Sequence, residues 1–319
     1  MGIYLNSTSA YSLYKRETEK PYFVDKSLFL SELMDTVQSG NPYICITRPR
    51  RFGKTVMANM IAAFFSDAYE SGDIFDDLKV SKELMYHQYK NQYKVIQISF
   101  NQMPKNCDSY QKYIERIENK LVLDLKLEYP QLFFDEEDAL WDMFHLIYEN
   151  VSGQQFVFVF DEWDYIFHRD FVTEKDKRAY IEFLSNLLKD KPYVAFSYMT
   201  GILPIAKYSS GSELNMFMEY TMATKEKFGE QFGFVDDEVD LLYEKYAVRE
   251  ANPNISREDL KVWYDGYQTF SGKRIYNPRS VVCALNDNQI SNYWTSSGPY
   301  DEIFYYIEHN IEDVRDDLA

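Results

Sequence analysis

The chain has 319 residues, 45% of them hydrophobic and 17% aromatic, which is enough for one large domain or two ordinary ones with a sizeable core. Its net charge of −17, from 51 acidic and 34 basic residues, excludes a protein that wraps nucleic acid non-specifically through a broad basic face. Three widely spaced cysteines exclude a disulfide framework, and no apolar run reaches the length of a membrane span, so we expect a soluble, cytoplasmic protein.

The N-terminal part leads into a buried strand. Residues 1–21 are polar and without periodicity, and we expect them to form an arm. Apolar residues at helical spacing over residues 27–37 predict a helix, which Gly40-Asn41-Pro42 ends. The apolar run over residues 43–46 is typical of a strand in the interior of a parallel sheet.

The turn after this strand carries the most informative motif of the chain. A Gly-Lys-Thr turn between a strand and a helix presents backbone N–H groups and a helix N-terminus to a phosphate chain. Gly53 would let the backbone approach an anion, Lys54 would contact the β- and γ-phosphates, and the hydroxyl of Thr55 would hold Mg²⁺. We expect this turn to bind a nucleoside triphosphate through Arg48, Pro49, Arg50, Arg51, Phe52, Gly53, Lys54, Thr55 and Val56.

The alternative for this segment is a basic turn that ends a strand and caps a helix. The usual phosphate-loop pattern has a first glycine where this chain has Arg48, so the motif alone is only moderately specific.

A second strand, over residues 93–100, and helices over residues 109–127 and 139–150 precede the next informative segment. There, a continuous apolar run from residue 156 to 160 ends in Asp161 and Glu162. Asp161 is expected to be the Mg²⁺ carboxylate, and Glu162 the general base that polarises the attacking water. The alternative is that the two acids only begin a solvated loop. Their position downstream of the Gly-Lys-Thr turn favours the nucleotide site.

The alternation of strands and helices predicts an α/β fold with a parallel sheet covered by helices on both faces. A helix over residues 174–189 is followed by a strand over residues 193–199, and residues 215–222 are expected to form an edge strand. Thr47, Asp161 and Thr200 follow three different strands at their carboxyl ends, where nucleotides bind in such sheets.

Beyond residue 225 the pattern changes to helices. Acids in a first turn over residues 234–239 and a capping box at Ser256-Arg257-Glu258-Asp259 predict two helix starts. We therefore expect two domains: a P-loop ATPase-like α/β domain over residues 1–222 and a smaller, helical, lid-like subdomain over residues 223–319.

Several motifs together resemble the AAA-ATPase-like family over nearly the whole chain, from about residue 11 to 294. They are Tyr22-Phe23-Val24-Asp25-Lys26, Thr47-Arg48-Pro49-Arg50-Arg51-Phe52-Gly53-Lys54-Thr55, Phe160-Asp161-Glu162-Trp163-Asp164, Thr200-Gly201, Trp263-Tyr264-Asp265-Gly266-Tyr267 and Tyr276-Asn277-Pro278. The resemblance implies an ATPase core with an additional strand and a catalytic glutamate. It also implies that Arg48 at the first-glycine position is part of the family pattern.

The resemblance adds further candidate residues. Thr200 would sense the γ-phosphate or orient the attacking water, or its hydroxyl only caps the next turn. Phe23, Val24 and Asp25 would cover the adenine, or Phe23 is simply a core residue. An arginine could complete the site from the lid or another subunit, and the open choices are Arg169, Arg178, Arg249 and Arg279.

The family is often fused to a C-terminal PD-(D/E)xK nuclease-like domain. Because the sequence ends at Ala319, soon after the region of resemblance, we expect that domain to be absent, and the chain to be a short form or a fragment.

Three functions follow as hypotheses. The first is hydrolysis of ATP with Mg²⁺, in which Lys54, Asp161 and Glu162 act as described. The second is a nucleotide-gated switch with little turnover, acting on a protein partner or within a homo-oligomer. The third is an acidic interaction domain whose basic turn binds a phosphorylated partner or inorganic phosphate. The charge balance does not support nucleic acid as a partner.

Overall fold

The computed structural model describes residues 2–69, 73–208, 211–222, 225 and 227–293. Its contacts divide these residues into two compact units. The first unit comprises the residues up to Glu19, Asp25–Ile46 and Thr55–Glu219. The second comprises Lys20–Val24, Thr47–Lys54 and the described residues from Tyr220 onward.

A five-stranded sheet of strand order β2-β3-β4-β1-β5 is the centre of the first unit. Strand β3 pairs in parallel with β2 and with β4, and every residue of β3 is buried, which explains its unbroken apolar sequence. The predicted α/β fold with a parallel sheet flanked by helices is confirmed. The strands are β1 (Tyr43–Thr47), β2 (Lys94–Ser99), β3 (Phe156–Asp161), β4 (Val194–Gly201) and β5 (Met218–Tyr220).

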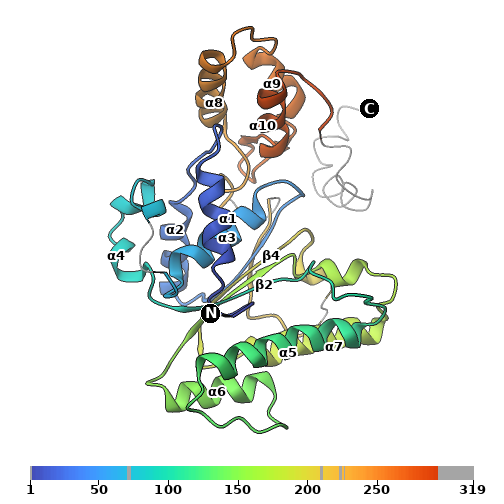
Figure 1. The fold of residues 1–319 in the computed structure, drawn as a ribbon. Coiled ribbons are helices and arrows are strands. Elements are labelled where there is room, and N and C mark those ends of the chain that lie inside the picture. The colour runs from blue at the N-terminus through green and yellow to red at the C-terminus, as the bar shows by residue number, and fades with distance from the viewer. Residues whose placement is uncertain (1, 70–72, 209–210, 223–224, 226, 294–319) are drawn as a thin grey trace. The chain divides into compact units, whose positions relative to one another are not determined.

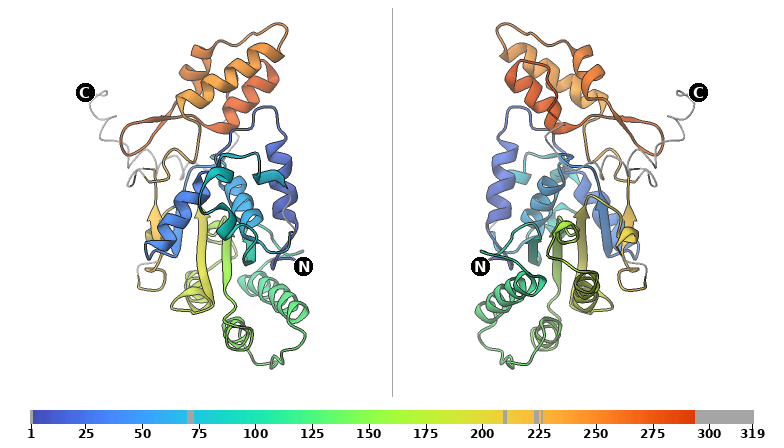
Figure 2. Two further views of the ribbon diagram at one scale, coloured as in Figure 1. Left: turned by 90° about the vertical axis from the view of Figure 1, so that its left-hand side faces the viewer. Right: turned by 90° about the vertical axis from the view of Figure 1, so that its right-hand side faces the viewer.

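Helices cover both faces of this sheet (Figures 1 and 2). On one face, Phe144 of α6 packs 5.5 Å from Phe158 of β3, and α5 and α7 lie beside α6. On the other, Phe65 of α3 packs 5.0 Å from Phe196 of β4. The elements are α1 (Ser9–Thr18), α2 (Phe29–Gln38), α3 (Lys54–Phe65), α4 (Tyr86–Tyr89), α5 (Tyr110–Glu128), α6 (Leu140–Asn150) and α7 (Glu174–Leu188), with short 3₁₀ turns at Asp73–Phe75, Lys79–Lys82, Tyr165–His168 and Ile205–Lys207.

The expectation that residues 1–21 form an aperiodic arm is wrong. They include α1, whose Ala10 and Tyr14 are buried one turn apart, a stripe too narrow to stand out in the sequence. Before it, Leu5 makes an antiparallel bridge with Ile96 and so covers the outer edge of β2. Tertiary contacts therefore order a segment whose local sequence carries little signal.

A buried carboxylate fastens this N-terminal segment to α5. Asp124, only 4% exposed, accepts the backbone N–H groups of Ile3 at 3.0 Å, Tyr4 at 2.7 Å and Leu5 at 3.1 Å. Three donors around one carboxylate compensate for its removal from water.

We expect Asp124→Ala to lower the free energy of unfolding by about 2–4 kcal/mol, because it strands three N–H groups away from water. Urea denaturation followed by circular dichroism measures this change. Asp77→Ala, at an exposed aspartate, is the matched control and should stay within about 0.5 kcal/mol of the parent protein. Equal stability of the two variants would show that Asp124 does not hold the segment.

Among its described residues, the second unit contains three helices, which Figure 1 labels α8, α9 and α10, and a two-stranded antiparallel hairpin. The helices share a core that includes Val239, Leu260 and Val281, together with Tyr22 from the Lys20–Val24 segment. The predicted capping box is confirmed: Ser256 N–H donates to Asp259 at 2.8 Å, and Asp259 N–H donates to the Ser256 hydroxyl at 3.1 Å. The elements are α8 (Asp236–Arg249), α9 (Arg257–Tyr264), β6 (Tyr267–Gln268), β7 (Arg274–Ile275) and α10 (Pro278–Asp287).

Candidate nucleotide site

The two predicted metal ligands meet at the carboxyl end of β3. Thr55, in the first turn of α3, donates its hydroxyl to Oδ2 of Asp161 at 2.8 Å. Asp161 is 2% exposed, whereas Thr55 lies at the surface. Two oxygen-bearing side chains 106 residues apart in sequence thus share one spot at the sheet edge where ligands bind in α/β folds.

Glu162, the predicted general base, follows directly and has a strained backbone. Its φ of +52° lies in the left-handed region, which costs a side-chain-bearing residue on the order of 1–3 kcal/mol. The turn closes with a hydrogen bond of 3.0 Å from the Tyr165 N–H to the Glu162 carbonyl. Strain of this kind persists only where neighbouring contacts fix the conformation, and it is concentrated at functional sites.

Thr200 is the register partner of Asp161 on the neighbouring strand β4. Its side chain is fully buried, and its hydroxyl donates to the carbonyl of Ile46 in β1 at 3.0 Å. Thr200 therefore links β4 to β1 beside Asp161, and any contact with a phosphate or water would require this hydroxyl to change partner.

Arg48, at the position where a first glycine is usual, is a buried anchor of the phosphate loop. Its guanidinium is fully buried and donates to the carbonyls of Tyr220 at 2.8 Å and Phe228 at 3.1 Å. It also lies 5.1 Å from the centre of the Phe232 ring, a cation–π distance. The side chain thus ties the loop to the last residue of β5 and to the segment after it, within the second unit.

Lys54 is held inside the loop itself. Its ammonium, on a side chain only 7% exposed, donates to the carbonyls of Arg48 and Pro49, each at 2.9 Å. Gly53, at φ +80°, has open space where a side chain would begin, so an anion can approach its backbone there. The ammonium is therefore already placed beside the loop backbone, bonded to carbonyls that a phosphate oxygen could replace.

The remaining loop residues have varied surroundings. Phe52 is buried and meets Tyr267 edge-on at 4.7 Å, and Arg51, at φ +71°, donates to the Tyr293 carbonyl at 2.7 Å. Pro49 is buried, Arg50 is exposed and Val56 is half-buried.

The residues predicted to cover an adenine are engaged in backbone contacts. The two carboxylate oxygens of Asp25 accept the N–H groups of Ser27 at 2.8 Å and Lys79 at 2.7 Å, so Asp25 orders the chain before α2. Phe23 is half-buried and its N–H donates to Lys20 at 3.1 Å.

The arginines proposed to complete the site differ in surroundings. Arg169 lies over the Tyr165 ring at 5.3 Å and donates to its hydroxyl at 3.2 Å, and Arg249 lies 6.0 Å from the Tyr22 ring. Arg178 and Arg279 are exposed.

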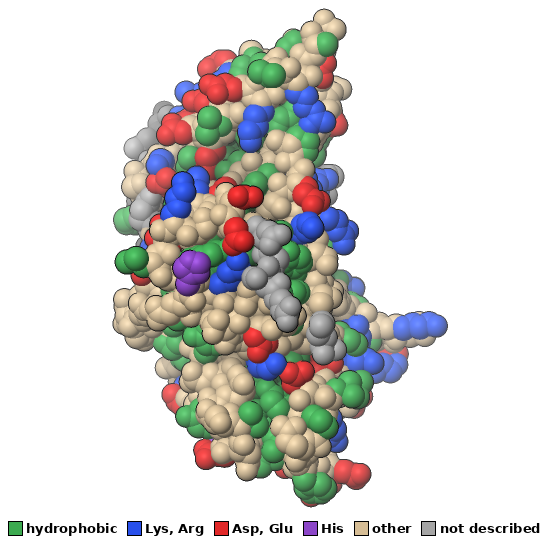
Figure 3. Space-filling model, turned by 60° about the vertical axis from the view of Figure 1, so that its left-hand side comes forward, with side chains coloured by type: hydrophobic (Ala, Val, Ile, Leu, Met, Phe, Trp, Pro, Cys, Tyr) green, Lys and Arg blue, Asp and Glu red, His purple; other side chains and the backbone are tan. Residues whose placement is uncertain are grey.

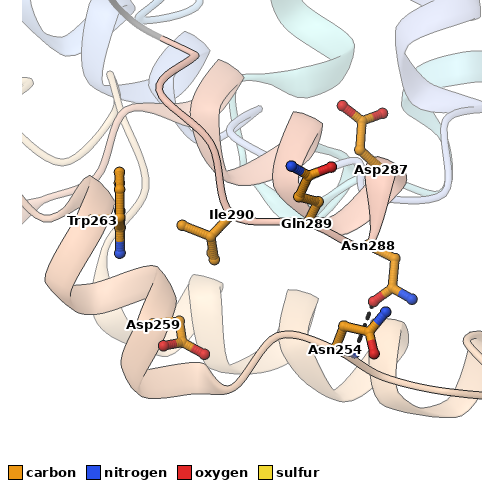
Figure 4. Close-up of a pocket in the computed structure, with 7 residues that line it drawn as sticks. All are labelled: Asn254, Asp259, Trp263, Asp287, Asn288, Gln289 and Ile290. Atoms are coloured by element: carbon orange, nitrogen blue, oxygen red, sulfur yellow. Dashed lines mark hydrogen bonds between the residues drawn. The ribbon is translucent and has the colours of Figure 1, made fainter.

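A pocket of about 660 Å³ lies within the second unit, between the start of α9 and the end of α10 (Figure 4). Its two acids already have partners: Asp259 belongs to the capping box, and Asp287 accepts the Tyr293 hydroxyl at 2.8 Å. It contains none of the predicted site residues. Its lining residues are Asn254, Asp259, Trp263, Asp287, Asn288, Gln289 and Ile290.

Sequence reasoning missed Asp164, two residues after Glu162. It is 1% exposed, and its Oδ2 accepts the N–H groups of Ile202 at 2.8 Å and Leu203 at 3.0 Å, just after β4. The sequence feature that could have indicated Asp164 is its place as a third acid in the Phe160-Asp161-Glu162-Trp163-Asp164 motif, directly after Trp163.

Comparisons with known proteins found a matching family model and a similar curated protein. A family model described as a predicted AAA-ATPase, AAA-ATPase-like, matches residues 11–210. An uncharacterized protein in the vnfD 5′ region of Azotobacter chroococcum mcd 1 is 23% identical over 291 residues, which are 89% of this chain and 52% of that protein. The chain thus spans about half the length of this relative. The comparison with solved structures found no match.

Every helix among the described residues is too short or too polar to cross a lipid bilayer. The phosphate-loop sequence, the contact between Thr55 and Asp161 and the parallel sheet all lie within or beside the region that the family model matches. Because that model covers more than half of its residues, the chain belongs to the AAA-ATPase-like family of predicted AAA-ATPases.

Proposed function

We propose that the protein binds ATP together with Mg²⁺ and hydrolyses it to ADP and phosphate. The observation that carries this proposal is the 2.8 Å hydrogen bond between the Thr55 hydroxyl and Asp161 Oδ2. It joins the end of the phosphate loop to the acidic end of β3, as a P-loop nucleotide site requires. Family membership supports nucleotide binding, and Lys54 and Glu162 are the chain neighbours of these two residues.

The donor atoms at this spot suit Mg²⁺. Oxygen ligands such as hydroxyls and carboxylates are the ones that it prefers, and the structure brings Thr55 Oγ1 and Asp161 Oδ2 together, 2.8 Å apart. A bound Mg²⁺ would supply charge neutralisation for the phosphates, held directly by Thr55 and directly or through water by Asp161.

The basic groups of the loop would bind the triphosphate. Lys54 would exchange its two carbonyl acceptors for oxygens of the β- and γ-phosphates. Arg48 would support phosphate binding indirectly, because its buried guanidinium fixes the conformation of the loop and adds positive charge behind it.

Glu162 would carry the chemical step. As the water oxygen bonds to the γ-phosphorus and the bond to the β-phosphate oxygen breaks, Glu162 takes a proton from the water and ADP leaves. Thr200 would sense the γ-phosphate from the adjacent strand after releasing the Ile46 carbonyl. Phe23 and Asp25 would lie near the adenine, and an arginine of the lid or of a second subunit would complete the charge.

The nucleotide-gated switch uses the same site and differs only in turnover. Lys54 bound to its own loop carbonyls fits a resting state that nucleotide binding would end. A turnover number far below 1 per minute that does not rise with any partner would favour the switch over the working hydrolase.

We propose nucleotide, rather than nucleic acid, as the main anionic ligand. Figure 3 shows a face on which acidic and basic side chains are interspersed, a distribution that does not concentrate positive charge for a polyanion. A protein partner or a homo-oligomer remains part of the proposal, with the protein acting in the cytoplasm.

Substitutions of the two proposed metal ligands, Thr55 and Asp161, test this proposal directly. Calorimetric titration of the protein with ATP, and in parallel with GTP, should show binding that is at least about 10-fold tighter with Mg²⁺ than with a chelator. Thr55→Val and Asp161→Asn should each remove most of that Mg²⁺ effect, because each deletes one oxygen ligand. Asp77→Asn, at an exposed aspartate, is the control and should keep it. Absence of nucleotide binding by the parent protein would overturn the proposed function.

A further inference from the structure

The strained turn that carries Glu162 is held by contacts between the residues that follow it and the end of β4. We call the residues of both segments the β3–β4 clasp: Trp163, Asp164, Gly201, Ile202 and Leu203. The clasp lies entirely within the first unit. Its carboxylate, Asp164, is almost fully buried and accepts two successive N–H groups of the neighbouring strand end, as described above. A buried charge that binds two backbone donors fixes the geometry of both segments.

Backbone contacts strengthen the clasp on both sides of Trp163. The Trp163 N–H donates to the Thr200 carbonyl at 3.2 Å, and the buried hydroxyl of Tyr180 donates to the Trp163 carbonyl at 2.8 Å. Burial raises the pKa of Tyr180 well above its usual value, so this hydroxyl stays protonated and remains a donor. Trp163, the residue after Glu162, is therefore held by both its N–H and its carbonyl group.

The clasp also excludes any side chain at residue 201. A β-carbon added to Gly201 would lie 2.6 Å from Nε1 of Trp163 and 2.8 Å from Oδ1 of Asp164. Both neighbours are fully packed, with Trp163 0% and Asp164 1% exposed, so neither has room to retreat. Glycine is required here by close approach, which shows how tightly the two strand ends are joined.

We propose that Asp164 is a positioning residue, which holds Glu162 in its left-handed conformation so that its carboxylate can meet the attacking water. This proposal rests on the proposed hydrolase function and deepens it. Asp164 acts through the backbone, because its Oδ2 accepts the N–H groups of Ile202 and Leu203. Releasing the turn would let Glu162 relax from its strained φ, and a displacement of about 1 Å at a catalytic group can cost about 100-fold in rate.

The test compares turnover with binding in a set of variants. Asp164→Ala should lower kcat about 30- to 100-fold with the dissociation constant for Mg²⁺-ATP within about 3-fold of the parent value. Asp164→Asn should restore part of the rate, because its amide oxygen can still accept an N–H group. Asp170→Asn, at an exposed aspartate six residues on, is the matched control and should leave both quantities unchanged.

A double variant separates positioning from a general loss of structure. In the Glu162→Gln background, adding Asp164→Ala should change the remaining turnover by less than about 3-fold, because the group that it positions is already gone. If Asp164→Ala does not fold, Tyr180→Phe gives the same test through the Trp163 carbonyl, with an expected 3- to 10-fold loss of kcat at about equal affinity. Unchanged kcat in a folded clasp variant, or losses that add fully to those of Glu162→Gln, would overturn the positioning role. A parent protein that binds no ATP or has no turnover would instead refute the proposed hydrolase, before any variant is compared.

Discussion

Lys54→Ala is expected to weaken the binding of Mg²⁺-ATP by at least about 100-fold, to the point where calorimetry detects no heat of binding. The Lys54 side chain is only 7% exposed, and the acceptors of its ammonium include the loop carbonyls of Arg48 and Pro49. Exchanging two neutral acceptors for charged phosphate oxygens is the electrostatic gain on which triphosphate affinity depends.

Lys54→Ala is also expected to lower the stability of the protein without nucleotide. The experiment must therefore separate this loss of stability from the loss of nucleotide binding. Without the ammonium, two loop carbonyls lose a donor, so a modest fall in melting temperature is expected alongside the loss of binding. Lys82→Ala, at an exposed lysine, is the matched control and should bind ATP as the parent does. ATP affinity within about 5-fold of the parent in a folded Lys54→Ala protein would contradict the assignment of Lys54 to the phosphates.

Much of the first unit could be predicted because its central strands β1 and β3 are largely buried. Their apolar runs, which end at Ile46 and Phe160, can be recognised without knowledge of the neighbouring strands. The order of a phosphate loop and an acidic strand end then led us to expect Thr55 and Asp161 at one site, and the structure places their side chains 2.8 Å apart. Their role as metal ligands stays a prediction.

The residues that escaped prediction act through backbone groups far away in the sequence. The sequence predicted Arg48 to be a phosphate ligand, whereas its guanidinium donates to the carbonyls of Tyr220 and Phe228, 172 and 180 residues further along the chain. Asp164 received no role from its sequence, because its acceptor role depends on N–H groups 38 and 39 residues downstream. A backbone group looks the same at every position, so the sequence alone cannot reveal which carbonyl or N–H a buried charge will meet.

Glu162→Gln is the second variant with a large expected effect, since it should preserve binding and abolish most turnover. The amide is nearly isosteric with the carboxylate but cannot accept a proton, so kcat should fall at least about 100-fold while the dissociation constant for Mg²⁺-ATP stays within about 3-fold. Turnover is measured by phosphate release, and affinity by calorimetry on the same preparation. Glu136→Gln, at an exposed glutamate, is the matched control.

The backbone of Glu162 makes this variant more informative than most. Glutamine tolerates φ +52° no better than glutamate does, so the strain of the turn is retained and a fall in rate reports the lost carboxylate. Glu162→Gly, in contrast, relieves the strain and removes the base, and should raise the melting temperature while leaving turnover as low as in Glu162→Gln. Together these two results would show that the strained turn lowers the stability of the folded protein and at the same time positions the catalytic carboxylate of Glu162. Hydrolysis at the parent rate in Glu162→Gln would show that Glu162 is not the general base. The strained backbone at Glu162 would then have no catalytic explanation.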